Sequence, residues 1–170
     1  MGIERDFARE AGFLTQWKLI GPFPNEGIDT PAPPETEYRD DAEYNGIDGK
    51  RVRWTNVRTP HIRGILDLLG LMDPNQNTVA YARAEFSIAE AGDAQIRLGS
   101  DDGIACWLNG EKVHSNDVDR GLTPDSDRVP VTLKSGSNVL LLKITQHGGG
   151  WAFCARVTDP DGNPISFSDE

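Results

Sequence analysis

The feature that most constrains the fold is a series of short alternating or apolar segments, separated by residues typical of turns. Segments of this length and composition indicate β-strands. Asn109-Gly110 directly follows one of them, and this dipeptide favours a two-residue hairpin because both residues tolerate positive φ. We expect strands at 14–20, 50–57, 79–88, 95–99, 104–108, 128–133, 138–145 and 151–158. So many short strands with frequent turns predict an all-β protein, a jelly-roll β-sandwich.

One segment has helical periodicity instead. In 61–72 (HIRGILDLLGLM) apolar residues recur at i, i+3, i+4 and i+7, which predicts a short helix or a turn that closes one end of the sandwich. Gly64 and Gly70 weaken the helix. A second short helix is expected within 4–12, so 1–12 is a helical or flexible lead-in. The length fits a single domain over 1–170.

The segment 22–45 differs in composition from the rest of the chain. It contains five prolines and seven acidic residues, but only one basic residue, Arg39. Pro22 and Pro24 are expected to stop the preceding strand because proline cannot donate to a β-ladder. We expect a long acidic, proline-rich loop, and a loop of this length in a compact domain is usually functional or flexible.

Charge and hydropathy exclude two classes of partner. The net charge is −10 and the 17 basic residues are scattered, which argues against nucleic acid as a partner. No apolar run approaches the ~20 residues that cross a membrane. The first residues lack the apolar region of a signal peptide, so the chain is either cytoplasmic or part of a larger exported protein, extracellular or periplasmic. The opening Met-Gly, typical of a cloning remnant, favours the second alternative.

The two cysteines, Cys106 and Cys154, both fall in expected strands. They are compatible with one disulfide in an oxidising compartment and equally with two buried free thiols. Alternation along the last strand places Cys154 on the face opposite Trp151, Phe153 and Val157.

Nothing in the sequence requires catalysis. His61, His114 and His147 have no metal-site spacing, and there is no GxSxG or phosphate-binding glycine loop. The adjacent carboxylates Asp101 and Asp102 are a weak candidate for an acid–base pair. We therefore expect a protein that is not an enzyme.

The same two aspartates are the first candidates for a binding site. The segment 100–103 (SDDG) reverses the chain between two strands, so one interpretation is simply a well-made turn. The alternative is that Asp101 and Asp102 direct their carboxylates at sugar hydroxyls or at a calcium ion. Calcium takes about 6–8 oxygen ligands, so these two residues alone cannot complete its shell.

Strand alternation predicts which loops meet. If the strands from 95 onward run up and down, the loops 100–103, 115–127 and 146–150 share one end of the sandwich. Asn116 and His147 are the further polar candidates there. Trp151 follows three glycines and is either a stacking surface for a sugar ring or the first core residue of its strand. Trp107 is expected to pack in or beside the core.

Several motifs resemble a known group of domains. The segments 98–113 (LGSDDGIACWLNGEKV), 17–24 (WKLIGPFP) and 134–143 (KSGSNVLLLK) are similar to β-sandwich accessory domains of bacterial polysaccharide-active proteins. These include the galactose-binding-domain-like jelly rolls and PA14-type domains, in which an Asp-Asp pair can hold calcium. Cys106, where an aliphatic residue is expected, departs from the pattern, as does the acidic loop.

The resemblance implies a non-catalytic carbohydrate-binding or accessory module, with polysaccharide or oligosaccharide as its partner. Calcium is the implied cofactor, held by Asp101 and Asp102. The alternative is a domain that packs against neighbouring domains of a larger polypeptide and binds no free sugar. The candidate ligand-binding residues are Asp101, Asp102, Asn116, His147 and Trp151.

Overall fold

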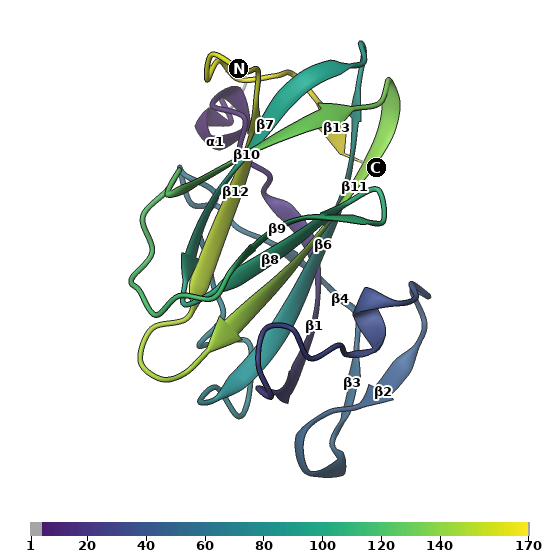
Figure 1. Cartoon of the computed structure of the whole chain (residues 1–170), viewed down its shortest axis with the longest axis vertical. Helices are drawn as coiled ribbons and strands as arrows, with labels where there is room; N and C mark the ends of the chain where they lie inside the picture. Colours follow the sequence, from purple (N-terminus) through teal and green to yellow (C-terminus); the bar gives the residue numbers. More distant parts are fainter. Residues whose placement is uncertain (1–4, 170) are drawn as a thin grey trace.

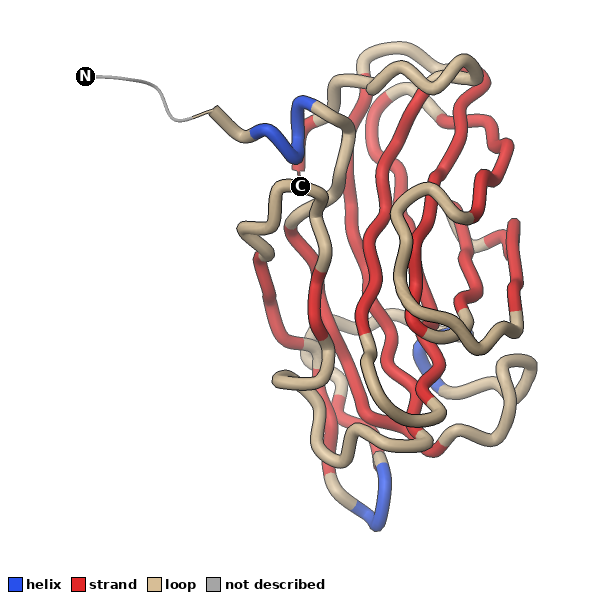
Figure 2. Tube along the Cα trace, turned by 90° about the vertical axis from the view of Figure 1, so that its left-hand side faces the viewer, coloured by secondary structure: helices blue, strands red, loops and turns tan. Residues whose placement is uncertain are grey.

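The computed structural model describes residues 5–169 and contains two facing antiparallel β-sheets (Figure 1). The larger sheet has the order β4-β1-β6-β11-β8-β9, with β13 also paired to β6, and the smaller has the order β10-β7-β12-β5. In Figure 2 the strands follow the long axis and loops gather at both ends. The predicted all-β sandwich is confirmed; its jelly-roll connectivity stays a prediction.

The bounds of the strands agree with the sequence expectations for the long segments and add short ones. The 50–57 segment divides into β3 and β4, and β2, β5, β9 and β13 were not predicted. The larger sheet comprises β1 (Gln16–Pro24), β4 (Thr55–Arg58), β6 (Thr78–Ile88), β8 (Ile104–Leu108), β9 (Glu111–Asn116), β11 (Gly136–Gln146) and β13 (Ser168–Asp169). The smaller comprises β5 (Leu66–Asp67), β7 (Gly92–Asp101), β10 (Asp127–Leu133) and β12 (Ala152–Thr158), and β2 (Glu43–Asn45) pairs with β3 (Arg51–Arg53) in a separate ribbon.

The core lies between the two sheets because alternate residues of each strand face inward. On β6, Ala82 and Phe86 belong to this core, whereas Tyr81 belongs to a second apolar cluster on the outer face of the sheet. Trp17 of the larger sheet packs edge-to-face on Phe153 of the smaller, with ring centroids 5.1 Å apart. Burial of this kind is the main stabilising contribution to a sandwich.

The acidic segment 22–45 is anchored to the outer face of the larger sheet. Lys143, 1% exposed, donates to the carbonyls of Ile28 (2.8 Å) and Thr30 (2.7 Å) and to the Glu35 carboxylate (2.8 Å). The Tyr81 hydroxyl donates to the same carboxylate. The segment contains the end of β1, a 3-10 turn η1 (Pro33–Glu35) and β2. The segment therefore covers part of the outer face of the larger sheet.

The expectation that Pro22 and Pro24 stop the first strand is wrong. β1 continues to Pro24, and its pairing with β4 ends at Leu19, so the later residues have a neighbour on one side only. The register against β6 also shifts between Ile20 and Phe23, which is a bulge. At an edge and in a bulge, a missing N–H costs no ladder bond.

The 61–72 segment forms the turn alternative and contains no helix. Gly64 has φ +62°, and a Cβ there would lie 2.9 Å from Cβ of Phe13, so the chain turns against that residue. Leu66 and Leu68 are buried with the two-residue period of a strand, whereas Ile62 is 61% exposed. The predicted N-terminal helix is present as α1 (Phe7–Glu10); residues 1–4 of the lead-in lie outside the described part.

Both cysteines are free and buried, so the disulfide alternative is not the one found. Cys106 lies in the main core, and Cys154 lies on the outer face of the smaller sheet with Ala8 and Phe13. Alternation therefore placed Cys154 correctly. Burial raises the pKa of each thiol to about 12. No helix within residues 5–169 has the length and apolar character needed to cross a membrane.

Candidate functional site

The three loops predicted to share one end do meet there, and Asp102 joins them. Its carboxylate accepts from the backbone N–H of Arg120 (3.3 Å) and of His147 (3.0 Å), and its own N–H donates to the Thr145 carbonyl (3.1 Å). Figure 1 shows the loops 115–127 and 146–150 at the same end of the molecule. We call the loops 100–103, 115–127 and 146–150 the loop end.

The two aspartates have different environments. Asp102 is 2% exposed, and its carboxylate is used to hold the loops. Asp101, at the end of β7, is half-buried and has no ion pair within residues 5–169. Burial, a hydrogen bond with Asp102 and the charges of Asp102 and Asp119 together raise the pKa of Asp101 to about 6. Asp101 is therefore the candidate whose carboxyl group remains available.

The other predicted residues are divided between the surface and the interior. The side chain of His147 is exposed, and Asn116 donates its amide to Asp127 (3.2 Å). Trp151 is 1% exposed and belongs to the main core. A ring with no accessible face cannot stack on a sugar, so the core alternative is the one found and the prediction of Trp151 as a ligand-binding residue is wrong.

The sequence did not point to a charged network that supports the loop end. Arg120 donates to both oxygens of Asp127 (3.0 Å each) and to the Ser100 carbonyl (3.0 Å). His114 also contacts Asp127 (3.1 Å). Burial by itself would raise the pKa of Asp127, but the hydrogen bonds from Arg120 and His114 lower it. A lone basic residue among the acidic residues of 115–127 was the signal that could have identified Arg120.

The loop end fits a calcium ion only in part. No group of three or more His, Cys, Asp or Glu side chains suited to a metal occurs in the described chain, 5–169. The crowding of negative charge on Asp101 is what a cation would relieve. Asp102 already accepts two backbone hydrogen bonds, so backbone and water oxygens would have to supply most ligands. Calcium at Asp101 and Asp102 stays a prediction.

The outer face of the larger sheet carries a hollow of about 220 Å³ beneath the acidic segment. We call it the outer-face hollow. Trp107 lines it, half-buried, and is not a member of the main core, so of the expected positions in or beside the core the first is wrong. Its neighbours Cys106 and Leu108 take the core positions. The residues that line it include Glu37, Tyr38, Trp54, Arg83, Trp107 and Leu141.

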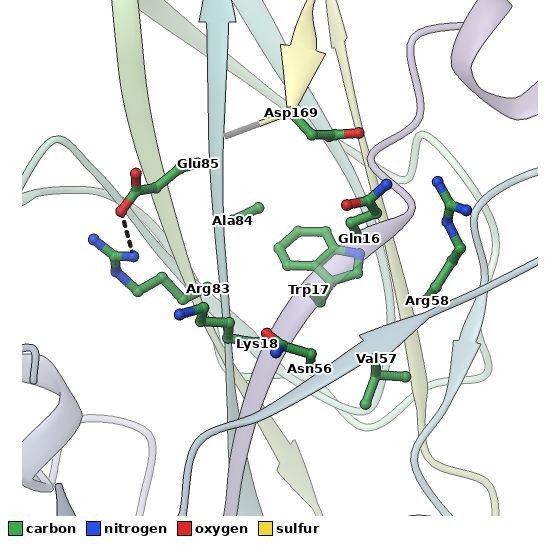
Figure 3. A pocket seen from close by; sticks show the side chains of 10 residues that line it. All are labelled: Gln16, Trp17, Lys18, Asn56, Val57, Arg58, Arg83, Ala84, Glu85 and Asp169. Atoms are coloured by element: carbon green, nitrogen blue, oxygen red, sulfur yellow. Dashed lines mark hydrogen bonds and ion pairs between the residues drawn. The ribbon is translucent and has the colours of Figure 1, made fainter. Parts of the chain in front are cut away.

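A second, larger hollow of about 560 Å³ lies beside it, between β1, β4 and β6 (Figure 3). Figure 3 shows Lys18, Arg58 and Arg83 around its rim and the Trp17 ring at its centre. Arg83 pairs with Glu85 (2.6 Å) and Lys18 with Asp40. Trp17 is 2% exposed and offers no stacking surface. Because Arg83 lines both hollows, they are neighbours on one face.

The Asp101 carboxyl gives the stability a defined pH dependence. Its pKa is 3.8 in an unfolded chain and about 6 in the folded protein, so the native state binds more protons between these values and stability falls as pH rises through them. We expect Asp101→Asn, which mimics the protonated carboxyl, to remove this slope and to melt at a higher temperature than wild type at pH 7.

Thermal melts from pH 4 to 7 measure this effect, with Asp117→Asn as the control because Asp117 is exposed in the same end. If the melting temperatures of the two variants depend on pH in the same way, the raised pKa of Asp101 is refuted. Added calcium is expected to raise the melting temperature of wild type and not of Asp101→Asn.

Comparison with known proteins adds information about the fold. No protein-family model and no curated protein sequence matches the chain. The β-glucosidase from Kluyveromyces marxianus, solved in complex with glucose, superposes on 83% of this chain and 16% of its own, with 18% identity and a TM-score of 0.53. A PA14 domain of the antifreeze protein MpAFP is similar over 52% of this chain and 48% of its own (17% identity, TM-score 0.43). A family 35 carbohydrate-binding module from an environmental isolate is similar over 54% of this chain and 70% of its own (22% identity, TM-score 0.38).

The likeness to the β-glucosidase establishes the fold alone, because one fold hosts many functions. PA14 domains and a carbohydrate-binding module are among the structures that the chain resembles, as its motifs predicted. The chain spans less than a fifth of the β-glucosidase.

Proposed function

We propose that the chain is a non-catalytic carbohydrate-binding or accessory module that contacts its glycan at the loop end. The observation that carries the proposal is the environment of Asp101. Its carboxyl group lacks a cationic partner within 5–169 and lies where Asp102 holds three loops together. A fixed acceptor on a rigid sandwich is suited to the hydroxyls of a sugar. The exposed side chain of His147, a residue whose backbone N–H donates to Asp102, supplies a second polar group at the loop end.

The likeness to the β-glucosidase supports the class of ligand. That enzyme was solved with glucose, and this chain corresponds to a minor part of it. An accessory module within a larger protein that acts on carbohydrate outside the cell or in the periplasm accounts for both facts. Calcium bound at Asp101 and Asp102 would be the cofactor of such a module.

A titration of the chain with a panel of plant, algal and microbial polysaccharides tests the proposal, with binding followed by calorimetry. We expect one glycan class to bind and Asp101→Asn to weaken that binding about tenfold, since a hydrogen bond to a charged group contributes about 1.5–3 kcal/mol. Asp117→Asn is the matched control. Binding that is equal in wild type and Asp101→Asn would place the glycan elsewhere.

A domain that packs against neighbouring domains is the second candidate. The exposed apolar side chains of Ile62 (61%) and Leu71 (51%), both between β4 and β6, favour it. If no glycan of the panel binds, and if Ile62→Ser together with Leu71→Ser abolishes self-association of the isolated chain, this second function replaces the first.

A further inference from the structure

Trp107 is the tryptophan most exposed to solvent in this protein. The chain has four tryptophans, and the other three, Trp17, Trp54 and Trp151, are each at most 7% exposed. Trp107 lies on the outer side of β8 and lines the outer-face hollow, with the Lys112 ammonium 5.4 Å from its ring centroid. An accessible indole in a concave site offers a flat apolar surface to a ligand.

The lining of the hollow also presents charged groups that are held by contacts of their own. The Glu37 carboxylate accepts from the Tyr44 hydroxyl (2.7 Å), and this hydrogen bond lowers the pKa of Glu37. The Arg83 guanidinium lies over the Tyr38 ring, 3.5 Å from its centroid, and pairs with Glu85 (2.6 Å). These contacts fix one acceptor and one donor before any ligand binds, which lowers the entropic cost of binding.

The acidic segment 22–45, which forms one wall of the hollow, is anchored to the sheet beneath it. Glu35 belongs to the lining and accepts from the buried Lys143. Glu35 is therefore a support for the wall, whereas Glu37, whose side chain is 45% exposed, faces solvent. Trp54 and Leu141 complete an apolar floor. The hollow combines an apolar lining with a few polar groups, as small-molecule sites do.

We infer that the outer-face hollow is a second carbohydrate site, which takes one neutral pyranose ring stacked on Trp107 with its hydroxyls bonded to Glu37 and Arg83. Sites for drug-sized ligands measure about 300–1,000 Å³. A hollow of about 220 Å³ suits a single sugar ring. The inference rests on the proposed function for the class of ligand, but it concerns a different face of the sandwich.

Quenching of tryptophan fluorescence by acrylamide tests the site on the whole chain. Most of the quenchable emission is expected to come from Trp107 because the other three rings are buried. D-glucose, D-galactose and the glycans of the panel are the probes. We expect a bound sugar to reduce the acrylamide quenching of wild type at least twofold. In Trp107→Phe, which lacks the accessible indole, most of the quenching is expected to be absent even without sugar.

Variants separate this site from the loop end. We expect Trp107→Ala and Glu37→Gln to weaken binding about tenfold, with melting temperatures close to that of wild type, and Asp101→Asn to leave the protection of Trp107 unchanged. If Asp101→Asn abolishes all sugar binding and the Trp107 and Glu37 variants bind like wild type, the second site is refuted and the proposed function stands. If only the outer-face variants lose binding, the second site stands and the loop-end site fails. No sugar binding at all overturns both.

Discussion

Lys143→Met is expected to destabilise the protein by about 3–5 kcal/mol, because removing one partner of a buried ion pair leaves the other charge uncompensated. Lys143 is 1% exposed and serves three acceptors at once, the Ile28 and Thr30 carbonyls and Glu35. Methionine keeps the length of the side chain but donates to none of them. The acidic segment would lose these three contacts with the sheet but keep those with Tyr81 and Lys18.

Chemical denaturation measures this loss, and Lys134→Met is the control because the Lys134 side chain is exposed. Surface substitutions of that kind usually change stability by less than about 0.5 kcal/mol. A loss below about 1 kcal/mol in Lys143→Met would contradict the anchoring role. Glu35→Gln combined with Lys143→Met should cost less than the sum of the single changes, since the two side chains are in contact.

Asp127→Ala is the second substitution with a large expected effect, a loss of about 2–4 kcal/mol. It removes the acceptor of both Arg120 amino groups (3.0 Å each) and of the His114 ring (3.1 Å). Arg120 would keep its charge in a site where its side chain is only 18% exposed. The loop 115–127 would then lose the ion pair that joins Arg120 to the start of β10, and the bond from Arg120 to the Ser100 carbonyl would remain.

Denaturation of Asp127→Ala beside Asp117→Ala measures the loss, and amide hydrogen exchange locates it. We expect faster exchange confined to the loop end and unchanged exchange in β6 and β11. Because the pKa of Asp127 is lowered, its stabilising contribution is present above the unfolded value of 3.8 and disappears as pH falls through the lower folded value. If the stability of wild type and that of Asp127→Ala decrease in the same way as the pH falls into the acid range, the stabilising role of the Asp127 carboxylate is refuted.

The sequence predicted the long strands well, because alternation and turn residues are local signals. It failed at Pro22 because the neighbours of a strand are decided by tertiary structure: β1 has lost β4 as a partner by that point. The 61–72 segment has both a helical and a two-residue period. Burial of Leu66 and Leu68, together with the close contact of Gly64 with Phe13, favoured the two-residue period of a strand over the helix.

The candidate site was predicted to the level of loops, and less well to the level of residues. Alternation brought the three loops together correctly, since Asp102 does contact Arg120 and His147. Trp151 takes the core position that was one of its two predicted alternatives, and Trp107 lines a surface hollow. A period of two shows which residues of a strand share a face. It does not show what packs against that face, and here the acidic segment packs against the outer face that carries Trp107.

The two free cysteines determine how the domain can be produced. Cys106 and Cys154 lie in different layers, one between the sheets and one beneath the N-terminal lead-in, and neither is bonded to the other. A thiol with a pKa of about 12 is almost entirely protonated at neutral pH and reacts slowly with oxidants. The native state therefore forms without thiol oxidation, disulfide isomerases have no bond to rearrange in it, and a reductant in the buffer leaves its stability unchanged.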